Sequence, residues 1–263
     1  MKVSRPMEPV PSISDLRIKI FADGADLNGI REMYAKPFIK GFTTNPTLMR
    51  KAGVKDYRAF AREAIAAVPD RPISFEVFAD DHATMEAQAM EIASWGANVN
   101  VKIPITNTKR QSSVPLVGRL SKRGVAVNVT AMFTLDQVRA TLDVLSADTP
   151  AILSIFAGRV ADSGRDPMPI MTEAVRLAAK AHPKAEVLWA SPREVLNLFH
   201  ADACGCHIIT VTNDLLNKLG SVGKDLERFS LETVEMFWRD ADAAGYNIPT
   251  RDAAPVLANG ARS

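Results

Sequence analysis

An α/β fold built from repeated strand–helix units is predicted by three observations. First, short apolar or β-branched runs alternate with stretches whose apolar residues have helical spacing. Second, eight such units follow one another, and eight parallel strands close a barrel. Third, the length of 263 residues suits one α/β barrel, since such barrels reach roughly 250 residues as a single domain. An open doubly wound sheet would favour a G-x-G-x-x-G loop, which does not occur. We therefore predict a single-domain (β/α)8 TIM barrel.

The eight strands are expected where the apolar runs lie, each ahead of a helical stretch. In chain order the runs are Arg17–Ala22, Gly41–Asn45, Ile73–Phe78, Asn98–Ile105, Gly124–Met132, Ala151–Ala157, Glu186–Ala190 and Cys206–Val211. The helical stretch Thr134–Ser146 is representative, because Leu135, Val138 and Leu142 fall on one face. Glycines and prolines separate the units, and successive parallel strands imply right-handed crossovers.

The two ends of the chain read differently from the barrel. Residues 1–16 are expected to be a flexible leader, since they carry several prolines and no apolar core of a secretion signal. The barrel domain is expected over 17–246, and 247–263 read as a tail. An extra C-terminal helix carries Phe229, Val234 and Phe237 after the eighth unit. Core packing is its default role, and the alternatives are that it caps the barrel or packs on another subunit.

Composition excludes several classes of function. The chain has 32 basic and 30 acidic residues, a formal net charge of +2, with 47% hydrophobic and 24% charged residues. These values are ordinary for a globular protein. The balanced charge gives no support to nucleic-acid or membrane-surface binding. No apolar run approaches the roughly 18 residues of a membrane span.

The cysteines indicate a reduced setting, and no metal site is expected. Cys204 and Cys206 are too few and too close for a disulfide framework, so a cytoplasmic location is the simpler interpretation. Together with His207 they superficially suggest zinc. However, Cys206 and His207 are adjacent near a strand start, where neighbouring side chains point to opposite faces. A fourth ligand at workable spacing is also lacking.

Polar residues stand at the ends of the predicted strands, where a barrel of this kind carries its active site. In order they are Asp23, Thr43, Thr44, Asn45, Glu76, Lys102, Thr130, Ser154 and Ser191. Lys102 lies in the apolar run Val99–Ile105. Burial there disfavours the ammonium form, and the neutral amine can attack a carbonyl to form a Schiff base. The alternative is a strand-end lysine that reaches out to water.

Two carboxylates at the same rim favour the catalytic interpretation. Asp23 and Glu76 could each be a solvated strand end or a helix N-cap if taken alone. Together with Lys102 they form a set suited to proton transfer around a nucleophilic amine.

Five segments resemble one known family, the transaldolases, and in particular its small branch that includes the fructose-6-phosphate aldolases. The segments are Phe21–Asp26, Gly41–Pro46, Val101–Pro104, Asn128–Thr130 and Ser154–Arg159. The resemblance runs from about Ile18 to Tyr246. Thr-Thr-Asn-Pro and Val-Lys-Ile-Pro, in this order on successive strands, are its more specific parts.

The resemblance implies a class I, Schiff-base mechanism on sugar phosphates. Lys102 would attack the ketone of a ketose phosphate, and Asp23 would take the proton of the C4 hydroxyl. Glu76 and Thr130 would hold the catalytic water and move protons. No metal or organic cofactor is required. The family also implies a homo-oligomer.

The resemblance further implies a set of substrate-contacting positions. These are Thr44, Asn45, Ser154, Phe156, Arg159, Ser191 and Arg193. Arginines suit a phosphate because the guanidinium donates two parallel hydrogen bonds, although each could be a surface arginine. Pro192 departs from the family pattern, in which an aromatic residue follows the serine, so the anionic end of the substrate could be held differently or be other than an ordinary phosphate.

Two positions favour group transfer over release of free dihydroxyacetone. Glu76 stands where the fructose-6-phosphate aldolases have glutamine, and Phe156 stands where they have tyrosine. A phenyl ring cannot help water to protonate and release the enamine. The leading interpretation is a transaldolase acting on fructose 6-phosphate or sedoheptulose 7-phosphate. The alternatives are a fructose-6-phosphate aldolase and a sugar-phosphate-binding barrel without turnover.

Overall fold

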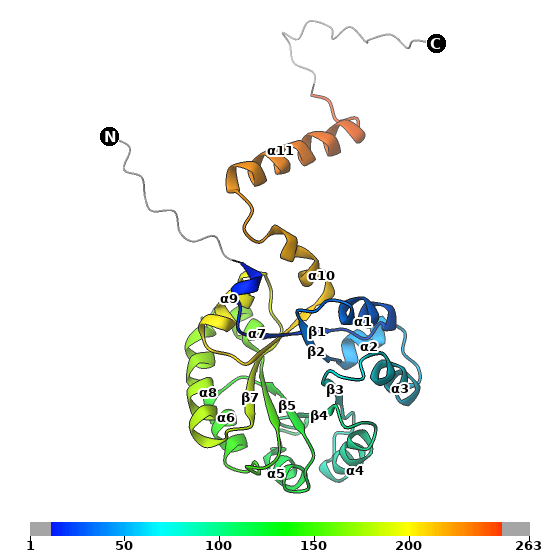
Figure 1. Ribbon diagram of the computed structural model, residues 1–263, viewed down its shortest axis with the longest axis vertical. Helices are drawn as coiled ribbons and strands as arrows, with labels where there is room; N and C mark the ends of the chain where they lie inside the picture. The colour runs from blue at the N-terminus through cyan, green and yellow to red at the C-terminus, as the bar shows by residue number, and fades with distance from the viewer. Residues whose placement is uncertain (1–11, 249–263) are drawn as a thin grey trace, which may run out of the picture. The chain divides into compact units, whose positions relative to one another are not determined.

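The computed structural model describes residues 12–248, and this part of the chain divides after Val222 into two units. The first unit is a closed barrel of eight parallel strands in sequential order, β1 to β8 (Figure 1). The strands are β1 Lys19–Asp23, β2 Ile39–Thr43, β3 Ile73–Glu76, β4 Val99–Pro104, β5 Val127–Met132, β6 Ala151–Ile155, β7 Ala185–Trp189 and β8 Ile208–Thr212. Each overlaps one predicted run, so the predicted barrel is confirmed.

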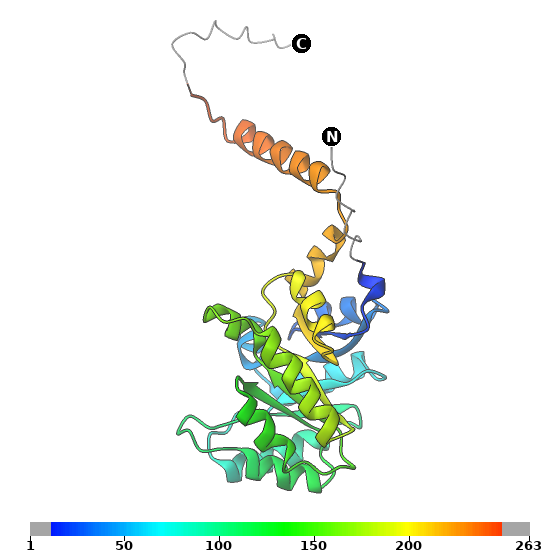
Figure 2. The same cartoon turned by 90° about the vertical axis from the view of Figure 1, so that its left-hand side faces the viewer.

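The helices form a ring outside the strands, as Figures 1 and 2 show. In the barrel unit they are α1 Leu27–Tyr34, α2 Pro46–Lys51, α3 Tyr57–Ala67, α4 His82–Ala93, α5 Val114–Lys122, α6 Leu135–Leu142, α7 Ala157–Asp162, α8 Met168–Ala181, α9 Leu196–Ala203 and α10 Asn213–Leu216, with 3-10 turns at Ile13–Asp15 and Asn217–Ser221. Polar caps fix where several of them begin: Asp26, Asn45, Asp56 and Asp81 each accept a backbone N–H of the first turn.

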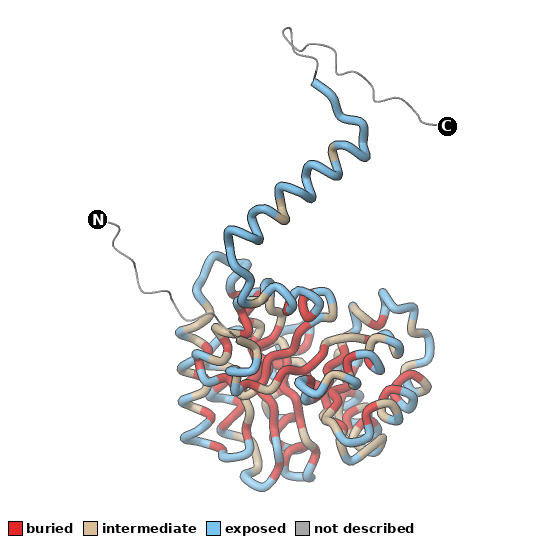
Figure 3. Tube along the Cα trace, turned by 45° about the horizontal axis from the view of Figure 1, so that its top comes forward, coloured by how far each residue is buried: buried red, intermediate tan, exposed pale blue. Residues whose placement is uncertain are grey.

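Buried apolar side chains form two clusters in the barrel. The larger core is made of buried side chains from both the strands and the helices. Figure 3 shows these buried positions along the central strands and along the helices around them. A second, smaller cluster comprises Phe21, Ile152, Leu188, Ala190 and Ile208. Gly41 on β2 accommodates it, because a Cβ there would lie 2.5 Å from the Phe21 ring. A packed barrel of this kind is open to ligands only at the strand ends.

The second unit begins at Gly223 and contains helix α11, Leu226–Ala243, which confirms the predicted C-terminal helix. Asp225 caps it by accepting the N–H of Arg228, and none of its residues is buried. Its exposed apolar side chains include Phe229, Val234 and Phe237. Within residues 12–248 no helix combines the length and apolar character needed to cross a membrane. Residues 1–11 of the predicted leader and 249–263 of the predicted tail lie outside the described part.

Candidate active site

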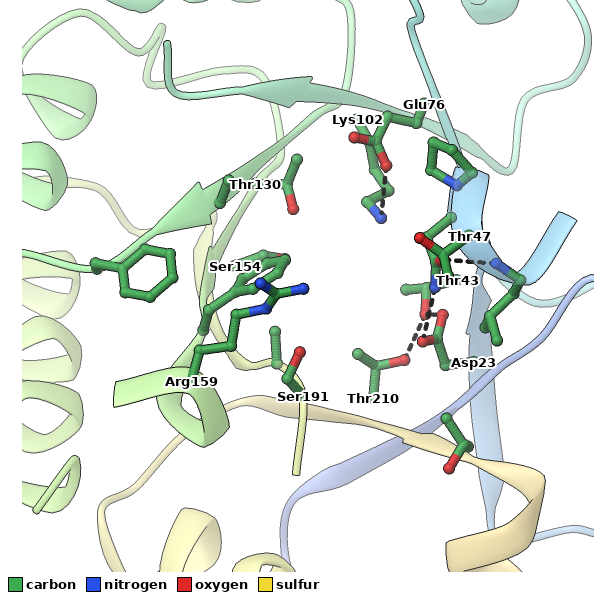
Figure 4. A pocket seen from close by; sticks show the side chains of 18 residues that line it. Asp23, Thr43, Thr47, Glu76, Lys102, Thr130, Ser154, Arg159, Ser191 and Thr210 are labelled. Carbon is green, nitrogen blue, oxygen red and sulfur yellow. Dashed lines mark hydrogen bonds and ion pairs between the residues drawn. The ribbon is translucent and has the colours of Figure 1, made fainter. Parts of the chain in front are cut away.

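A cavity of about 470 Å³ lies at the C-terminal ends of the strands (Figure 4). Nine of the eleven site residues predicted from the sequence line it: Asp23, Asn45, Glu76, Lys102, Thr130, Ser154, Phe156, Arg159 and Ser191. The structure thus brings most of the predicted set to one place. The remaining two, Thr44 and Arg193, do not line it.

Lys102 and Glu76 form an ion pair at the wall of this cavity. They are register partners on the neighbouring strands β4 and β3. The Lys102 Nζ lies 3.1 Å from Glu76 Oε2, and the two side chains are 9% and 17% exposed. The same Nζ donates a 2.8 Å hydrogen bond to the carbonyl of Thr44. The amine is therefore fixed in place, with a carboxylate close enough to accept its proton.

Tyr57 holds the backbone of Glu76. Its hydroxyl accepts the Glu76 N–H at 2.8 Å and donates to the Glu76 carbonyl at 3.0 Å. Strand β2 ends at Thr43, so the Tyr57 hydroxyl satisfies groups at the end of β3 that β2 does not reach. Burial raises the pKa of Tyr57, which keeps this hydroxyl protonated and able to donate. Its ring packs edge-on against Phe75 and Trp95.

Asp23 stands at the end of β1, beside β2. Its Oδ1 accepts a 2.7 Å hydrogen bond from the Thr43 hydroxyl, and its Oδ2 accepts a 3.1 Å bond from Asn45 Nδ2. Asn45 has a second role, because its Oδ1 caps α2 by accepting the Leu48 N–H. Burial raises the pKa of Asp23 above its ordinary value, while the positive charge of Lys102 and these hydrogen bonds oppose the rise. A carboxyl group whose pKa is raised in this way is suited to act as a base.

A buried polar chain supports the far wall. Asn128 Nδ2 donates to the Ser74 hydroxyl at 3.1 Å, and the Ser154 hydroxyl donates to Asn128 Oδ1 at 2.6 Å. Ser154 thereby presents its oxygen lone pairs to the cavity it lines. Beside them, the β5–β6 register shifts between Val129 and Met132, where Ala131 has a φ of 58°. This irregularity shapes the wall next to Thr130.

The opposite side of the cavity carries Arg159 and Ser191. Arg159 extends over the Phe156 ring, 5.7 Å from its centroid, and forms no ion pair with any of the described residues. Ser191 has a φ of 58° and brings its carbonyl against Gly158. A Cβ at Gly158 would lie 1.5 Å from that oxygen, so only glycine fits there.

Thr44 and Arg193 take other places. Thr44 is fully buried, and its hydroxyl donates to the Ser74 carbonyl at 2.9 Å. It contributes its backbone carbonyl to Lys102, while the adjacent Thr43 lines the cavity. The Arg193 guanidinium forms a two-point ion pair with Asp162. Both side chains thus have partners outside the cavity, and their expected contacts with substrate stay predictions.

Several residues of the site were not predicted as functional from the sequence. Thr43 and Thr210 hydrogen-bond beside Asp23, and Phe133 stacks near Phe156 with ring centroids 5.9 Å apart. Tyr57 acts from a helix 19 residues before Glu76. The sequence did indicate Thr43, because it was expected at the end of a strand. No pattern in the sequence indicated Tyr57.

Metal-binding side chains are not clustered in the described part of the chain: no three or more His, Cys, Asp or Glu residues are grouped in residues 12–248. Cys204 and Cys206 are buried free thiols, and burial raises the pKa of both.

The fold and the cavity define a (β/α)8-barrel protein with an amine, two carboxylates and an arginine at the C-terminal mouth. The sequence profile of the Transaldolase/Fructose-6-phosphate aldolase family matches residues 20–253. The chain belongs to this family, and with it to the aldolase and transferase enzymes.

Named relatives agree with this membership. A probable transaldolase of Dehalococcoides mccartyi is 35% identical over 202 residues, covering 77% of this chain and 90% of that protein. A probable transaldolase of Thermoanaerobacter sp. is 34% identical over 225 residues, covering 85% and 98%. Among solved structures, KGPDC from Streptococcus mutans aligns with a TM-score of 0.51 at 14% identity, over 76% of this chain and 89% of that one, which is a likeness of fold.

Proposed function

We propose that the chain is a class I transaldolase. It moves a dihydroxyacetone unit from a ketose phosphate, such as fructose 6-phosphate or sedoheptulose 7-phosphate, to an aldose phosphate. One observation carries this proposal: a buried amine, that of Lys102, lies 3.1 Å from a carboxylate in a cavity that Asp23 and Thr130 also line. Such a set is what Schiff-base formation and proton transfer require.

The first half of the reaction forms the Schiff base. Glu76 accepts the ammonium proton of Lys102, and the neutral amine adds to the C2 carbonyl of the ketose. The resulting carbinolamine takes up a proton on its oxygen and loses water to give an iminium ion. We assign the transfer of these protons, through a water molecule, to Glu76 and Thr130, which both line the cavity.

The second half breaks and remakes a carbon–carbon bond. Asp23 takes the proton of the C4 hydroxyl, the C3–C4 bond breaks, and its electron pair flows into the iminium to give an enamine on Lys102. The aldehyde that begins at C4 leaves. An incoming aldehyde accepts the enamine carbon, Asp23 returns the proton to the new hydroxyl, and hydrolysis frees Lys102. No cofactor enters this scheme.

Phe156 supports transfer rather than release of free dihydroxyacetone. Its ring lines the cavity, close to Phe133 and Arg159, and has no proton to donate. The enamine therefore waits for an aldehyde. A Phe156→Tyr variant places a hydroxyl there, and we expect it to increase dihydroxyacetone release measured without an acceptor.

Borohydride trapping tests the proposal. The protein is incubated with fructose 6-phosphate and reduced, and its intact mass and peptide map are recorded. We expect a reduced three-carbon adduct on Lys102 and ketose turnover that depends on an acceptor aldehyde. Turnover without an acceptor would identify the aldolase alternative instead. Ketose phosphate binding without any adduct, across several ketose phosphates, would identify a non-catalytic binding barrel.

A further inference from the structure

The Asp23 carboxylate is the first group of a hydrogen-bonded chain that continues through two threonine hydroxyls. Strand β1 lies between β2 and β8, and Thr43 on β2 is the register partner of Asp23. The Thr43 hydroxyl donates to Asp23 Oδ1 at 2.7 Å and is also hydrogen-bonded to the hydroxyl of Thr210 on β8. Thr210 is 7% exposed and lines the cavity. The three side chains form one hydrogen-bonded row across three strands (Figure 4).

Counting protons fixes the direction of this row. Each threonine hydroxyl has one hydrogen to donate. When Asp23 is ionised it can only accept, so the hydrogen of Thr43 is committed to Asp23. The bond between the two threonines must then be donated by Thr210. When Asp23 is protonated on Oδ1 it can donate to Thr43, and the hydrogen of Thr43 turns toward Thr210. Protonation of Asp23 on Oδ1 therefore allows the row to reverse.

We propose that Thr210 is a positioning residue for Asp23: by donating to Thr43 it stabilises the row in the direction that serves the ionised carboxylate. This inference rests on the proposed function for the role of Asp23 as the base. A hydroxyl that itself receives a hydrogen bond is polarised and becomes a stronger donor, so Thr210 acts on Asp23 through Thr43.

Alongside the opposing charges of Lys102 and Glu76, uncharged hydroxyl and amide groups stabilise the ionised Asp23 carboxylate. The charged groups that act on Asp23 are Lys102 on β4 and Glu76 on β3, and they have opposite signs. From the N-cap of α2 the uncharged amide of Asn45 donates to Asp23 Oδ2, and from β8 the Thr210 hydroxyl acts through Thr43. Loss of the Thr210 donor is therefore expected to raise the pKa of Asp23 further.

The test follows the titration of Asp23 directly, in the absence of substrate. The protein is labelled with 13C at aspartate carboxyl carbons, and Asp23→Asn assigns the resonance. We compare Thr210→Val, which keeps the shape and removes the hydroxyl, with Thr210→Ser, which keeps the hydroxyl. Thr212→Val is the matched control, because Thr212 is an exposed cavity-lining threonine of the same strand. Circular dichroism confirms that each variant folds, and Thr210→Ala replaces the valine variant if it does not.

We expect the Asp23 midpoint to rise in Thr210→Val and to stay at the wild-type value in Thr210→Ser and Thr212→Val. In the transfer assay, kcat/KM of Thr210→Val should fall about threefold to tenfold on the acid side, the size of one neutral hydrogen bond, with KM unchanged. An unchanged midpoint in Thr210→Val, or an equal rise in Thr210→Ser, would overturn the inference. Failure to trap an adduct on wild-type Lys102 would instead count against the proposed function, since the titration needs no catalysis.

Discussion

The two sides of the cavity differ in how far their polar groups are already engaged. On the β1–β4 side, Lys102 is held by Glu76 and the Thr44 carbonyl, and Asp23 is held by Thr43 and Asn45. On the β6–β7 side, Arg159 forms no ion pair within residues 12–248. Figure 4 shows the contrast, with its dashed lines gathered around Asp23 and Lys102.

This difference separates reacting groups from anchoring groups. Groups that must transfer protons gain from being fixed before the substrate arrives, because no reorganisation is then needed during the reaction. A group that binds a charged substrate gains from having no internal partner to displace. The first side is thus built for chemistry and the second for binding, which makes the effects of substitution separable.

The largest expected effect is on the reacting side. Lys102→Met keeps an unbranched side chain of similar length and removes the amine, so kcat/KM should fall by about 10³-fold or more. Borohydride should trap no adduct on this variant. Lys40→Met is the matched control: Lys40 also lies on a strand but is exposed, and its Nζ donates to the Pro37 carbonyl. Full activity in Lys102→Met would exclude the Schiff-base mechanism.

The residues expected to react could be predicted well from the sequence because parallel strands align their ends. The polar residue that closes each apolar run was expected at one rim, and Asp23, Glu76, Lys102 and Thr130 all reach the same cavity. It was harder to predict, from the alternation of side chains along a strand, which of its last residues face the cavity. Thr43 and Thr44 are neighbours and point to opposite sides, so a shift of one residue exchanges the cavity-lining threonine for the buried one.

Other features had no local signal. Arg193 pairs with Asp162, which is 31 residues away, and Tyr57 reaches Glu76 from a different element. Both contacts depend on how helices pack on the barrel, which the pattern of apolar residues does not specify. The expected phosphate contact of Arg193 thus stays a prediction, and one that this ion pair disfavours.

The second-largest expected effect is on the anchoring side, where the effects of replacing Arg159 and Arg193 on KM can be compared. Arg159→Ala should raise KM for a ketose phosphate about 10-fold to 100-fold, since hydrogen bonds to charged groups contribute about 1.5–3 kcal/mol. The value of kcat should change little. Arg193→Ala should raise KM by less than about threefold, because its guanidinium is engaged by Asp162. Equal effects of the two substitutions on KM would contradict this division.

The third effect tests how firmly the reacting side is held. Tyr57→Phe removes the hydroxyl that bridges the N–H and carbonyl of Glu76, at a cost of about 1–3 kcal/mol in the free energy of unfolding. We expect kcat to fall about tenfold at unchanged KM, because displacement of a positioned proton acceptor affects chemistry more than binding. Tyr34→Phe is the control, since its hydroxyl bonds to the exposed Asp70. A lower unfolding free energy with unchanged kcat would limit Tyr57 to a structural role.

The smallest effect concerns the stability of the reacting side. The folded protein holds the pKa of Asp23 above the ordinary value of 3.8, chiefly through burial. The stability that the neutral carboxyl contributes is therefore fully present below the unfolded-state pKa and is lost as pH rises through the folded-state pKa. Asp23→Asn lacks this dependence. The new amide NH2 group also faces the Nδ2 donor of Asn45, and the resulting cost in stability does not vary with pH.

The unfolding free energies of wild type and Asp23→Asn, measured in urea from pH 4 to pH 8, should therefore change relative to each other in one direction. Asp23→Asn should gain on wild type as pH rises through the Asp23 midpoint, and the difference should then level off above it. A parallel pair of curves would mean that Asp23 is not destabilised by its burial, and that the reacting side carries no cost in stability for its chemistry.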